Sequence, residues 1–474
     1  MTVQSTTPAF KRNVSDALAD AQLQEALRIA KPGFSGGRAR ARAALPEFDD
    51  LRDAARDLKD HVLGHLDHYL EAYERRVVES GGVVHWAETA EDARRIVLEI
   101  CREADAKAVN KGKTMISEEC GINAHLEAHG ILPVETDLGE YIIQLAGEHP
   151  SHIIAPAIHV TVEEIRERFR AAHGHLPEDR DLSGLDTLLR EARAVLREKY
   201  FAAEVGITGA NMLVAETGQS VIVTNEGNGD LSQSLPRVHV VMASIEKIVP
   251  TLEDAATILR VLGRSATGQE MSVYTTFSDG PRRMQDPDGP EEYHVVLLDN
   301  GRSGMLGSEF QDMLRCIRCG ACMNHCPVYG AVGGHAYGWV YPGPMGAVLT
   351  PSLIGVEEGG QLPNASTFCG RCEAVCPMRI PLPKMMRHWR EREFEKRLTP
   401  AANRWGLGVW RALASRPALY RLAMRGAAFG LSWLGRGGRI RRLPLAGAGW
   451  TDQRDFPAPE PGGTFMSRYR PDAA

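Results

Sequence analysis

The spacing of hydrophobic residues divides the chain into segments of different character. In residues 1–70, apolar side chains recur every three or four positions among many charged ones, as in SDALADAQLQEALRIA and FDDLRDAARDLKDHVLGHL. That period matches the turn of an amphipathic helix. We therefore expect a helical N-terminal extension over residues 1–70.

Between residues 71 and 298 the pattern alternates. Short β-branched runs such as QSVIVTNEG, RVHVVMASI and YHVVLLD stand between helical segments such as EDARRIVLEICREA and TLEDAATILRVLGRSA. Separate strands and helices in this order favour an α/β domain with a largely parallel sheet. The polar segments Gly206–Asn211 and Thr224–Asn228 are of the kind that binds small molecules at strand ends, although ordinary turns use the same residues.

The charged residues of this region show no catalytic pattern. We expect the carboxylate pairs to cap helices or face solvent, namely Glu118 with Glu119 and Glu135 with Asp137, and Lys111 and Lys113 to be solvated. Three histidines show no ligand spacing: His149, His152 and His159. No Gly-x-Gly-x-x-Gly follows a strand, so the sequence predicts no dinucleotide site of that type.

Composition adds one decisive feature, the placement of cysteine. Seven of the nine cysteines lie between Cys316 and Cys376, and the other two are Cys101 and Cys120. The N-terminus resembles no signal peptide and no run of about 20 apolar residues occurs, so we expect a cytoplasmic protein. Structural disulfides are rare there, so clustered cysteines indicate metal. The net charge of -6 is too small to indicate a nucleic-acid partner.

The cysteines form two related motifs. The first, CIRCGACMNHCP, places Cys316, Cys319, Cys322 and Cys326 in the C-x2-C-x2-C-x3-C-P run of bacterial ferredoxins. The second, CGRCEAVCP, places Cys369, Cys372 and Cys376 with the same ending. In two-cluster ferredoxins the last cysteine of each run ligates the other cluster. This predicts Cys316, Cys319, Cys322 and Cys376 on cluster one, and Cys326, Cys369 and Cys372 on cluster two.

Cluster two is one thiolate short, because the expected position holds Ser366. Three arrangements are open. The site holds a [3Fe–4S] cluster, or a [4Fe–4S] cluster whose fourth iron takes water, hydroxide, Ser366 or a partner's ligand, or a ligand from elsewhere such as Cys120. We expect two [4Fe–4S] clusters, the second with one non-cysteine corner. Zinc is the alternative, with His325 completing one site, but zinc does not require the paired Cys-Pro endings.

Residues 301–382 thus form a ferredoxin-type two-cluster domain. The 42 residues between Cys326 and Cys369 are rich in glycine and include His335, Tyr337, Trp339 and Tyr341. We expect a long loop there that covers the clusters.

Residues 383–474 are predicted to form a basic helical C-terminal region. From Lys384 to Arg442 there are 15 Lys and Arg against 3 Asp and Glu, with tryptophans interspersed. Such helices suit an acidic partner, the acidic body of the same chain or an anionic membrane surface. We favour the first two, and the third would place the protein peripherally on the inner face of the membrane.

Both motifs and their surroundings resemble the lactate utilization protein B family. The resemblance rests on CIRCGACMNHCPVYGAVGGHAYGWVYPGPMGAVLTP and CGRCEAVCPMRIPLP, and on segments such as GITGANMLVAETGQSVIVTNEGNGDLSQSLPRVHVVMASIEKIVPT. It covers roughly residues 70–390. It implies a NagB/RpiA/CoA transferase-like lactate-utilization domain over residues 71–298, and the same two cysteine ligand sets.

The resemblance also implies a role. It predicts an iron-sulfur electron-transfer subunit that acts in oxidising L-lactate to pyruvate with two partners. One partner is a cysteine-rich redox subunit and the other is a second protein with a lactate-utilization domain. The chain would then be a redox component rather than catalytic alone. The alternative is an enzyme that binds a hydroxy acid at the open iron of cluster two, and a regulatory sensor is disfavoured because no DNA-binding motif occurs.

Overall fold

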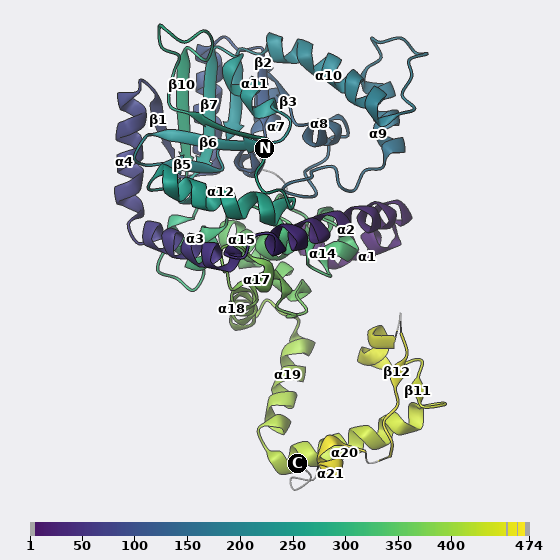
Figure 1. Ribbon diagram of the computed structural model, residues 1–474. Helices are drawn as coiled ribbons and strands as arrows, with labels where there is room; N and C mark the ends of the chain where they lie inside the picture. The colour runs from purple at the N-terminus through teal and green to yellow at the C-terminus, as the bar shows by residue number, and fades with distance from the viewer. Residues whose placement is uncertain (1–4, 452–453, 462, 470–474) are drawn as a thin grey trace. The chain divides into compact units, whose positions relative to one another are not determined.

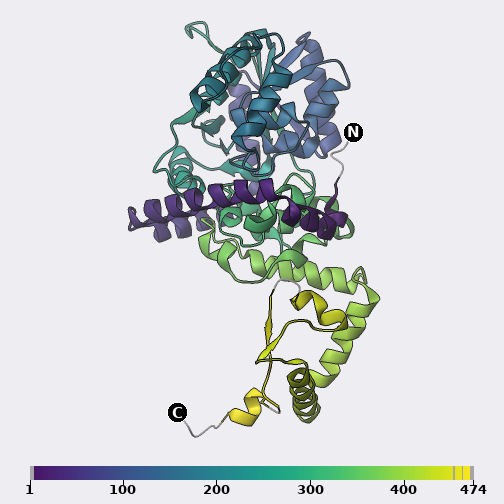
Figure 2. The ribbon, with the colours of Figure 1, turned by 90° about the vertical axis from the view of Figure 1, so that its right-hand side faces the viewer.

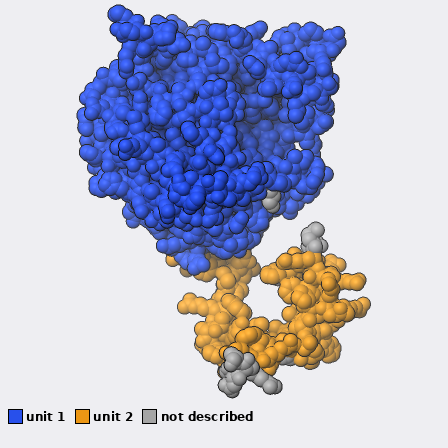
Figure 3. All heavy atoms as spheres, in the orientation of Figure 1, with its two compact units in different colours: residues 1–392 blue, residues 393–474 orange. Residues whose placement is uncertain are grey.

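The computed structural model describes residues 5–451, 454–461 and 463–469. The chain divides into two compact units, residues 1–392 and 393–474 (Figure 3). The first unit contains the α/β sheet, the N-terminal helices and both cysteine motifs. The second consists mainly of two helices and a short ribbon.

The centre of the first unit is a six-stranded parallel sheet (Figure 1). Its strand order is β1-β10-β7-β4-β2-β3. The strands are β1 (Val83–Ala87), β2 (Ala108–Gly112), β3 (Leu132–Glu135), β4 (Val205–Gly209), β7 (Val238–Ser244) and β10 (Glu292–Leu298). Every residue of β4 and β7 is buried, as expected of parallel strands covered on both faces. The predicted α/β class is confirmed.

Helices and a second sheet cover the two faces. One face packs on α5 (Ala90–Glu103), α6 (Met115–Cys120) and α7 (Ile122–Glu127). The other packs on α4 (Leu66–Glu79) and on strands of the second sheet, whose order is β8-β5-β6-β9. Those strands are β5 (Met212–Val214), β6 (Gln219–Thr224), β8 (Ile248–Val249) and β9 (Tyr274–Ser278). Capping boxes fix where two helices begin, at Thr89 for α5 and at Thr251 for α12 (Leu252–Ala266).

Four further helices lie beside β3 or against the sheet. Helices α8 (Leu138–Leu145), α9 (Val162–Ala172) and α10 (Leu185–Ala202) share a small core with Val134 of β3. Helix α11 (Asn228–Ser234) contacts β2, β4 and β7. Its approach requires glycine at position 206, where a Cβ would lie 1.7 Å from the carbonyl oxygen of Ser232. Gly206 therefore belongs to a buried strand and not to a binding turn.

The N-terminal helices pack against the cysteine segment and α12. They are α1 (Phe10–Ala19), α2 (Ala21–Ala43) and α3 (Phe48–Leu63), preceded by a short 3-10 turn, η1 (Thr7–Ala9). Both ribbon views show α2 along the segment that carries the first cysteine motif, and its contacts with α13 and α14 agree (Figure 2). Phe10 and Phe48 are buried in the same core as that segment. Within the described residues of the range 1–70, most positions from Phe10 onwards are helical.

The cysteine segment is a series of short helices. They are α13 (Ala321–Asn324), α14 (Tyr329–Val332), α15 (Gly343–Ile354), α16 (Val356–Gly359), α17 (Arg371–Val375) and α18 (Leu382–Glu395). Short 3-10 turns stand among them or lead into them, namely η3 (Ser303–Met305), η4 (Gln311–Arg315), η5 (His335–Tyr337) and η6 (Leu362–Ala365), whereas η2 (Ile245–Lys247) joins β7 to β8. The prediction of a long loop between Cys326 and Cys369 is therefore wrong, because the segment contains α14, α15 and α16. Helix α15 begins with a proline in its first turn and is buried on all sides over Gly343–Pro351, so it shows no amphipathic period.

The second unit is largely exposed. It contains α19 (Ala401–Ala414), α20 (Pro417–Leu434), a ribbon of β11 (Arg439–Ile440) and β12 (Phe456–Pro457), a 3-10 turn η7 (Leu445–Thr451) and α21 (Phe465–Arg468). Large side chains stand exposed on it, among them Trp405, Trp410 and Trp433. Across the described part of the chain, no helix has the length and apolar character needed to cross a membrane.

A buried histidine in the sheet predicts how stability depends on pH. The Nε2 atom of His239, on β7, lies 2.8 Å from the Thr208 hydroxyl oxygen, and burial lowers the pKa of His239 to about 3. The unfolded chain, with a histidine pKa of about 6.5, therefore binds this proton first. The contribution of neutral His239 to the free energy of unfolding is complete above about pH 6.5. It is lost at about 1.4 kcal/mol per pH unit as the pH falls towards 3.

The variant His239→Gln, which keeps a polar atom near Thr208, is expected to flatten this dependence. Between pH 7 and pH 5 its loss of unfolding free energy should be smaller than that of the unchanged chain by about 2 kcal/mol. Anaerobic urea unfolding at both pH values measures the difference, and effects common to both proteins cancel. Equal losses in the two proteins would show that His239 does not titrate in this way.

Candidate metal centres

Four cysteines line one cavity of the cysteine segment. Cys316, Cys319 and Cys322 come from the first motif, and Cys376 comes from the second. The other walls are mainly apolar and include Ile153, Ile317, Met345, Met378, Ile380 and Leu382. The structure thus brings together the four side chains predicted for cluster one, although Cys376 stands 54 residues after Cys322 in the sequence.

Three cysteines line a second cavity. They are Cys326, Cys369 and Cys372, the set predicted for cluster two, and Ser366 lines the same cavity. Cys369 is exposed, whereas Cys372 is buried. The spare Cys120 lies on α6 in the core of the α/β sheet and lines neither cavity. Of the fourth ligands considered from this chain, only Ser366 borders the site.

The backbone places Ser366 where the first motif has Cys316. Each residue follows a 3-10 turn, η4 or η6, with nearly the same dihedral angles: φ -67° and ψ 119° for Cys316, φ -67° and ψ 131° for Ser366. Two positions later both motifs have a residue at positive φ, Arg318 at 59° and Phe368 at 54°.

The correspondence continues through the rest of each motif. Gly320 and Gly370 take φ values of 71° and 75° immediately before α13 and α17. Positive φ is accessible to glycine without strain, so these turns fix where each short helix begins. The two motifs are therefore two copies of one backbone design, and the missing thiolate is a change of side chain alone.

Burial affects the acidity of these thiols. It raises the pKa of Cys319 and of Cys372 to about 12, and that of Cys376 to about 11. Thiolates are the form that binds iron. A cation at each cavity would offset the cost of burying these thiolates. The donor sets, four sulfurs in one apolar cavity and three sulfurs with a hydroxyl in the other, fit iron-sulfur clusters.

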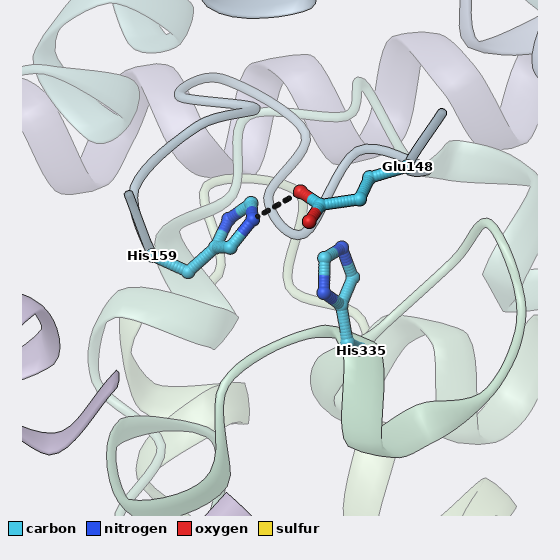
Figure 4. A group of neighbouring side chains, drawn as sticks. All are labelled: Glu148, His159 and His335. Carbon is cyan, nitrogen blue, oxygen red and sulfur yellow. Dashed lines mark hydrogen bonds and ion pairs between the residues drawn. The ribbon is translucent and has the colours of Figure 1, made fainter. Parts of the chain in front are cut away.

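A third group of possible ligands lies away from the cysteines (Figure 4). Glu148, His159 and His335 offer atoms within 4.8 Å of one another. Their polar atoms already have partners within the protein. His159 Nε2 lies 2.9 Å from Glu148 Oε2, and His335 Nε2 lies 2.7 Å from the His149 carbonyl oxygen. The group links the α/β domain to the segment between the two motifs.

Comparisons with known proteins identify two domain families in the chain. The LUD domain model matches residues 70–298 and the 4Fe-4S dicluster domain model matches residues 312–380. Lactate utilization protein B of Exiguobacterium sp. is 42% identical over 452 residues, which are 95% of each chain. Lactate utilization protein B of Bacillus licheniformis is 40% identical over 472 residues, 99% of this chain and 97% of its own. The chain belongs to the lactate utilization protein B family.

Escherichia coli K12 has a relative named uncharacterized electron transport protein YkgF. It is 39% identical over 470 residues, 99% of this chain and 98% of its own. Membership of the lactate utilization protein B family confirms the predicted resemblance and the fold class, an α/β LUD domain followed by a 4Fe-4S dicluster domain.

In this member of the family, arginines of the N-terminal helices hold the second motif. The Arg52 guanidinium donates to the Cys376 carbonyl oxygen at 2.6 Å through Nη2 and at 3.1 Å through Nε, and to that of Ala374 at 3.0 Å. Arg38 donates to the Val375 carbonyl oxygen at 2.8 Å. Both side chains are buried. They satisfy the free carbonyls at the end of α17, which the sequence could not indicate.

A buried ionic network joins the LUD domain to the cysteine segment. Arg302, fully buried, donates to both carboxylate oxygens of Glu119, at 2.9 Å and 2.6 Å. The Tyr341 hydroxyl donates to the same carboxylate at 2.6 Å. Arg302 Nε lies 3.2 Å from Glu246, whose other oxygen lies 3.4 Å from Arg318. Despite burial, the arginine keeps the pKa of Glu119 below its usual value.

The predictions made from the sequence for Glu119 and Lys111 are wrong. Glu119 was expected at a cap or in solvent, and Lys111 in solvent, yet both are buried. Lys111 forms ion pairs with Glu118 and with Glu135, the latter at 2.6 Å. Asp137 does cap a helix, because its carboxylate accepts the Gly139 amide at the start of α8. A buried ion pair leaves no periodic pattern, since its partners come from separate elements.

Proposed function

We propose that this chain is the iron-sulfur electron-transfer subunit of a complex that oxidises L-lactate to pyruvate. Cys316, Cys319, Cys322 and Cys376 would hold one [4Fe–4S] cluster, and Cys326, Cys369 and Cys372 a second with three cysteine ligands. The name of the Bacillus licheniformis relative refers to lactate utilization and that of the Escherichia coli relative to electron transport.

The observation that carries the proposal is the pairing of two cysteine-lined cavities in one small domain. Helices α13 and α17, which follow the two turns, contact each other. Tyr337 lines the second cavity, and burial raises the pKa of its hydroxyl well above its usual value, with smaller contributions from Cys326 of that cavity and Cys322 of the first. Clusters at both sites would be close enough to pass electrons one at a time between a two-electron donor and an acceptor.

The proposal includes partners. A cysteine-rich redox subunit and a second protein with a lactate-utilization domain would complete the complex. The second unit, with its excess of Lys and Arg and its exposed tryptophans, supplies a surface for an acidic partner or for peripheral contact with an anionic membrane. Nothing in the net charge of -6 favours nucleic acid.

One experiment tests the relay and its alternative together. The full chain is purified anaerobically, its iron and acid-labile sulfide are measured, and EPR spectra are recorded with L-lactate, first alone and then with the two partners. The relay predicts two cluster signals after chemical reduction, and lactate-dependent reduction only with the partners. Reduction by lactate without partners would favour the alternative, a hydroxy acid bound at the open corner of the second cluster. Zinc without visible absorption would overturn both.

The Ser366 position gives a separate prediction. The variant Ser366→Cys is expected to supply the missing thiolate, because Ser366 matches Cys316 in backbone angles and borders the second cavity. The second cluster should then keep four irons on exposure to air for at least about tenfold longer than in the unchanged chain. Ser352→Cys, on α15 and lining neither cysteine cavity, is the control and should change neither iron content nor EPR spectrum. An equal effect of both variants would argue against Ser366 as the corner position.

A further inference from the structure

A third cavity lies at the carboxyl edge of the parallel sheet. It is lined by residues at or just after the ends of three strands: Lys113 after β2, Gly209 at the end of β4 and Met242 of β7. Open α/β sheets bind their ligands at this edge. Asn211, Thr224 and Asn225 of the second sheet and its turns form another wall. The cavity is thus formed between the two sheets and their connecting turns.

Three polar groups at this cavity have no partner within the described part of the chain. Lys247, only 8% exposed, makes no hydrogen bond or ion pair there through its ammonium group. The Nη1 atom of Arg318 and the hydroxyl of Thr224 are buried without a hydrogen-bond partner. Leaving the two buried donors, Arg318 Nη1 and the Thr224 hydroxyl, unpaired is costly, on the order of 1–3 kcal/mol each. Lys247, Arg318 and Thr224 can therefore donate hydrogen bonds to a ligand that has acceptor oxygens.

The charged side chains that line the cavity are three cations, Lys113, Lys247 and Arg318, and two carboxyl groups, Asp137 and Glu140. Lys113 already contacts two carboxylates, Asp137 at 3.0 Å and Glu226 at 2.7 Å, so it offers no unpaired positive charge. Burial together with neighbouring carboxylates raises the pKa of Glu140 well above its usual value. Arg318 is partly balanced by Glu246. Lys247 is the lining cation that forms no ion pair within the described part of the chain.

The size of the cavity restricts the ligand. Its volume is about 140 Å³. A cavity of about 150 Å³ accommodates benzene, a ligand of about six non-hydrogen atoms. A three-carbon 2-hydroxy acid or the matching 2-oxo acid has the same number. Its carboxylate would pair with Lys247 and Arg318. The hydroxyl or oxo oxygen on its second carbon would form a hydrogen bond with the Thr224 hydroxyl.

We propose that this cavity binds a small 2-hydroxy or 2-oxo monocarboxylate through Lys247, Arg318 and Thr224. Arg318 stands between Cys316 and Cys319, and both Arg318 and Ile153 line this cavity as well as the four-cysteine cavity. The ligand would thus lie one side chain away from the first metal site and not at the open corner of the second. The choice of L-lactate and pyruvate as probes rests on the proposed function; the site itself rests on the cavity.

Calorimetric titration of the full, anaerobically purified chain with L-lactate and pyruvate tests the proposal. Both are expected to bind, and L-lactamide, which lacks the negative charge, should not. Lys247→Met should weaken binding at least about tenfold, as expected for a lost charge-assisted hydrogen bond. Thr224→Val, which keeps the side-chain shape, should weaken it about fivefold. Lys107→Met, at an exposed lysine of the same domain, is the matched control and should bind as the unchanged chain does.

Iron content and EPR spectra of the same samples separate this proposal from the proposed function. A chain with both clusters that binds neither acid, or binds them equally well after Lys247→Met and Thr224→Val, would overturn the site and leave the relay intact. A chain that binds the acids but holds no iron would overturn the relay and leave the site intact. If Lys247→Met fails to fold, Thr224→Val decides the result.

Discussion

Replacing Cys376 by alanine is expected to abolish the cluster of the first motif and to spare that of the second. Sequence order alone would assign Cys376 to Cys369 and Cys372, but the structure places it with Cys316, Cys319 and Cys322. A site reduced to three thiolates in a buried cavity would lose affinity or iron. Cys372→Ala should have the opposite effect, because its side chain lines the other cavity.

Iron and sulfide analysis with EPR of the reduced protein distinguishes the two variants. Each should lose up to about half of the iron, from different signals, and lactate-dependent electron transfer with the partners should fall at least about a hundredfold in both. Cys101→Ala is the control, since Cys101 is buried on α5 in the α/β core. Loss of the second signal in Cys376→Ala, with the first retained, would reverse the proposed ligand sets.

Replacing Arg302 by methionine is expected to cause the largest loss of stability. Arg302 is fully buried and neutralises Glu119 while also lying beside Glu246. Removing one partner of a buried pair leaves an uncompensated charge and costs about 3–5 kcal/mol. Anaerobic urea unfolding measures this change. The double variant Arg302→Met with Glu119→Gln should recover part of the loss, because no carboxylate is then left unpaired.

An exposed ion pair supplies the control for this measurement. Arg392 donates to Glu309 at 2.6 Å, but both side chains are more than a third exposed. Arg392→Met should therefore change the unfolding free energy by only about 0–1 kcal/mol. If Arg302→Met lowered the unfolding free energy no more than Arg392→Met does, the buried network would not be an important link between the LUD domain and the cysteine segment.

The sequence indicated the fold class because strands, helices and cysteine runs each leave a local pattern. The buried strands β7 and β10 were visible as β-branched runs, and the two Cys-Pro endings already indicated crossing ligand sets. Ser366 could be singled out because the two motifs share one spacing. These features depend on residues a few positions apart.

Features that depend on distant residues could not be predicted in this way. The hydrogen bonds from Arg38 and Arg52 to the second motif and the burial of Lys111 and Lys247 all depend on what other elements bring near. Helix α15 was mistaken for loop because its glycines and prolines are typical of turns and its burial on all sides removes the amphipathic period.

The hydrogen bonds of Arg38 and Arg52 have a consequence for how the protein matures during synthesis. These arginines leave the ribosome more than 300 residues before the carbonyls of Val375 and Cys376 that they bind. The first cavity likewise lacks its fourth sulfur until Cys376 emerges. Nascent chains shorter than this would carry open, oxidisable thiols. Neither the hydrogen bonds of Arg38 and Arg52 nor the four-sulfur cavity can therefore form before residue 376 has been synthesised.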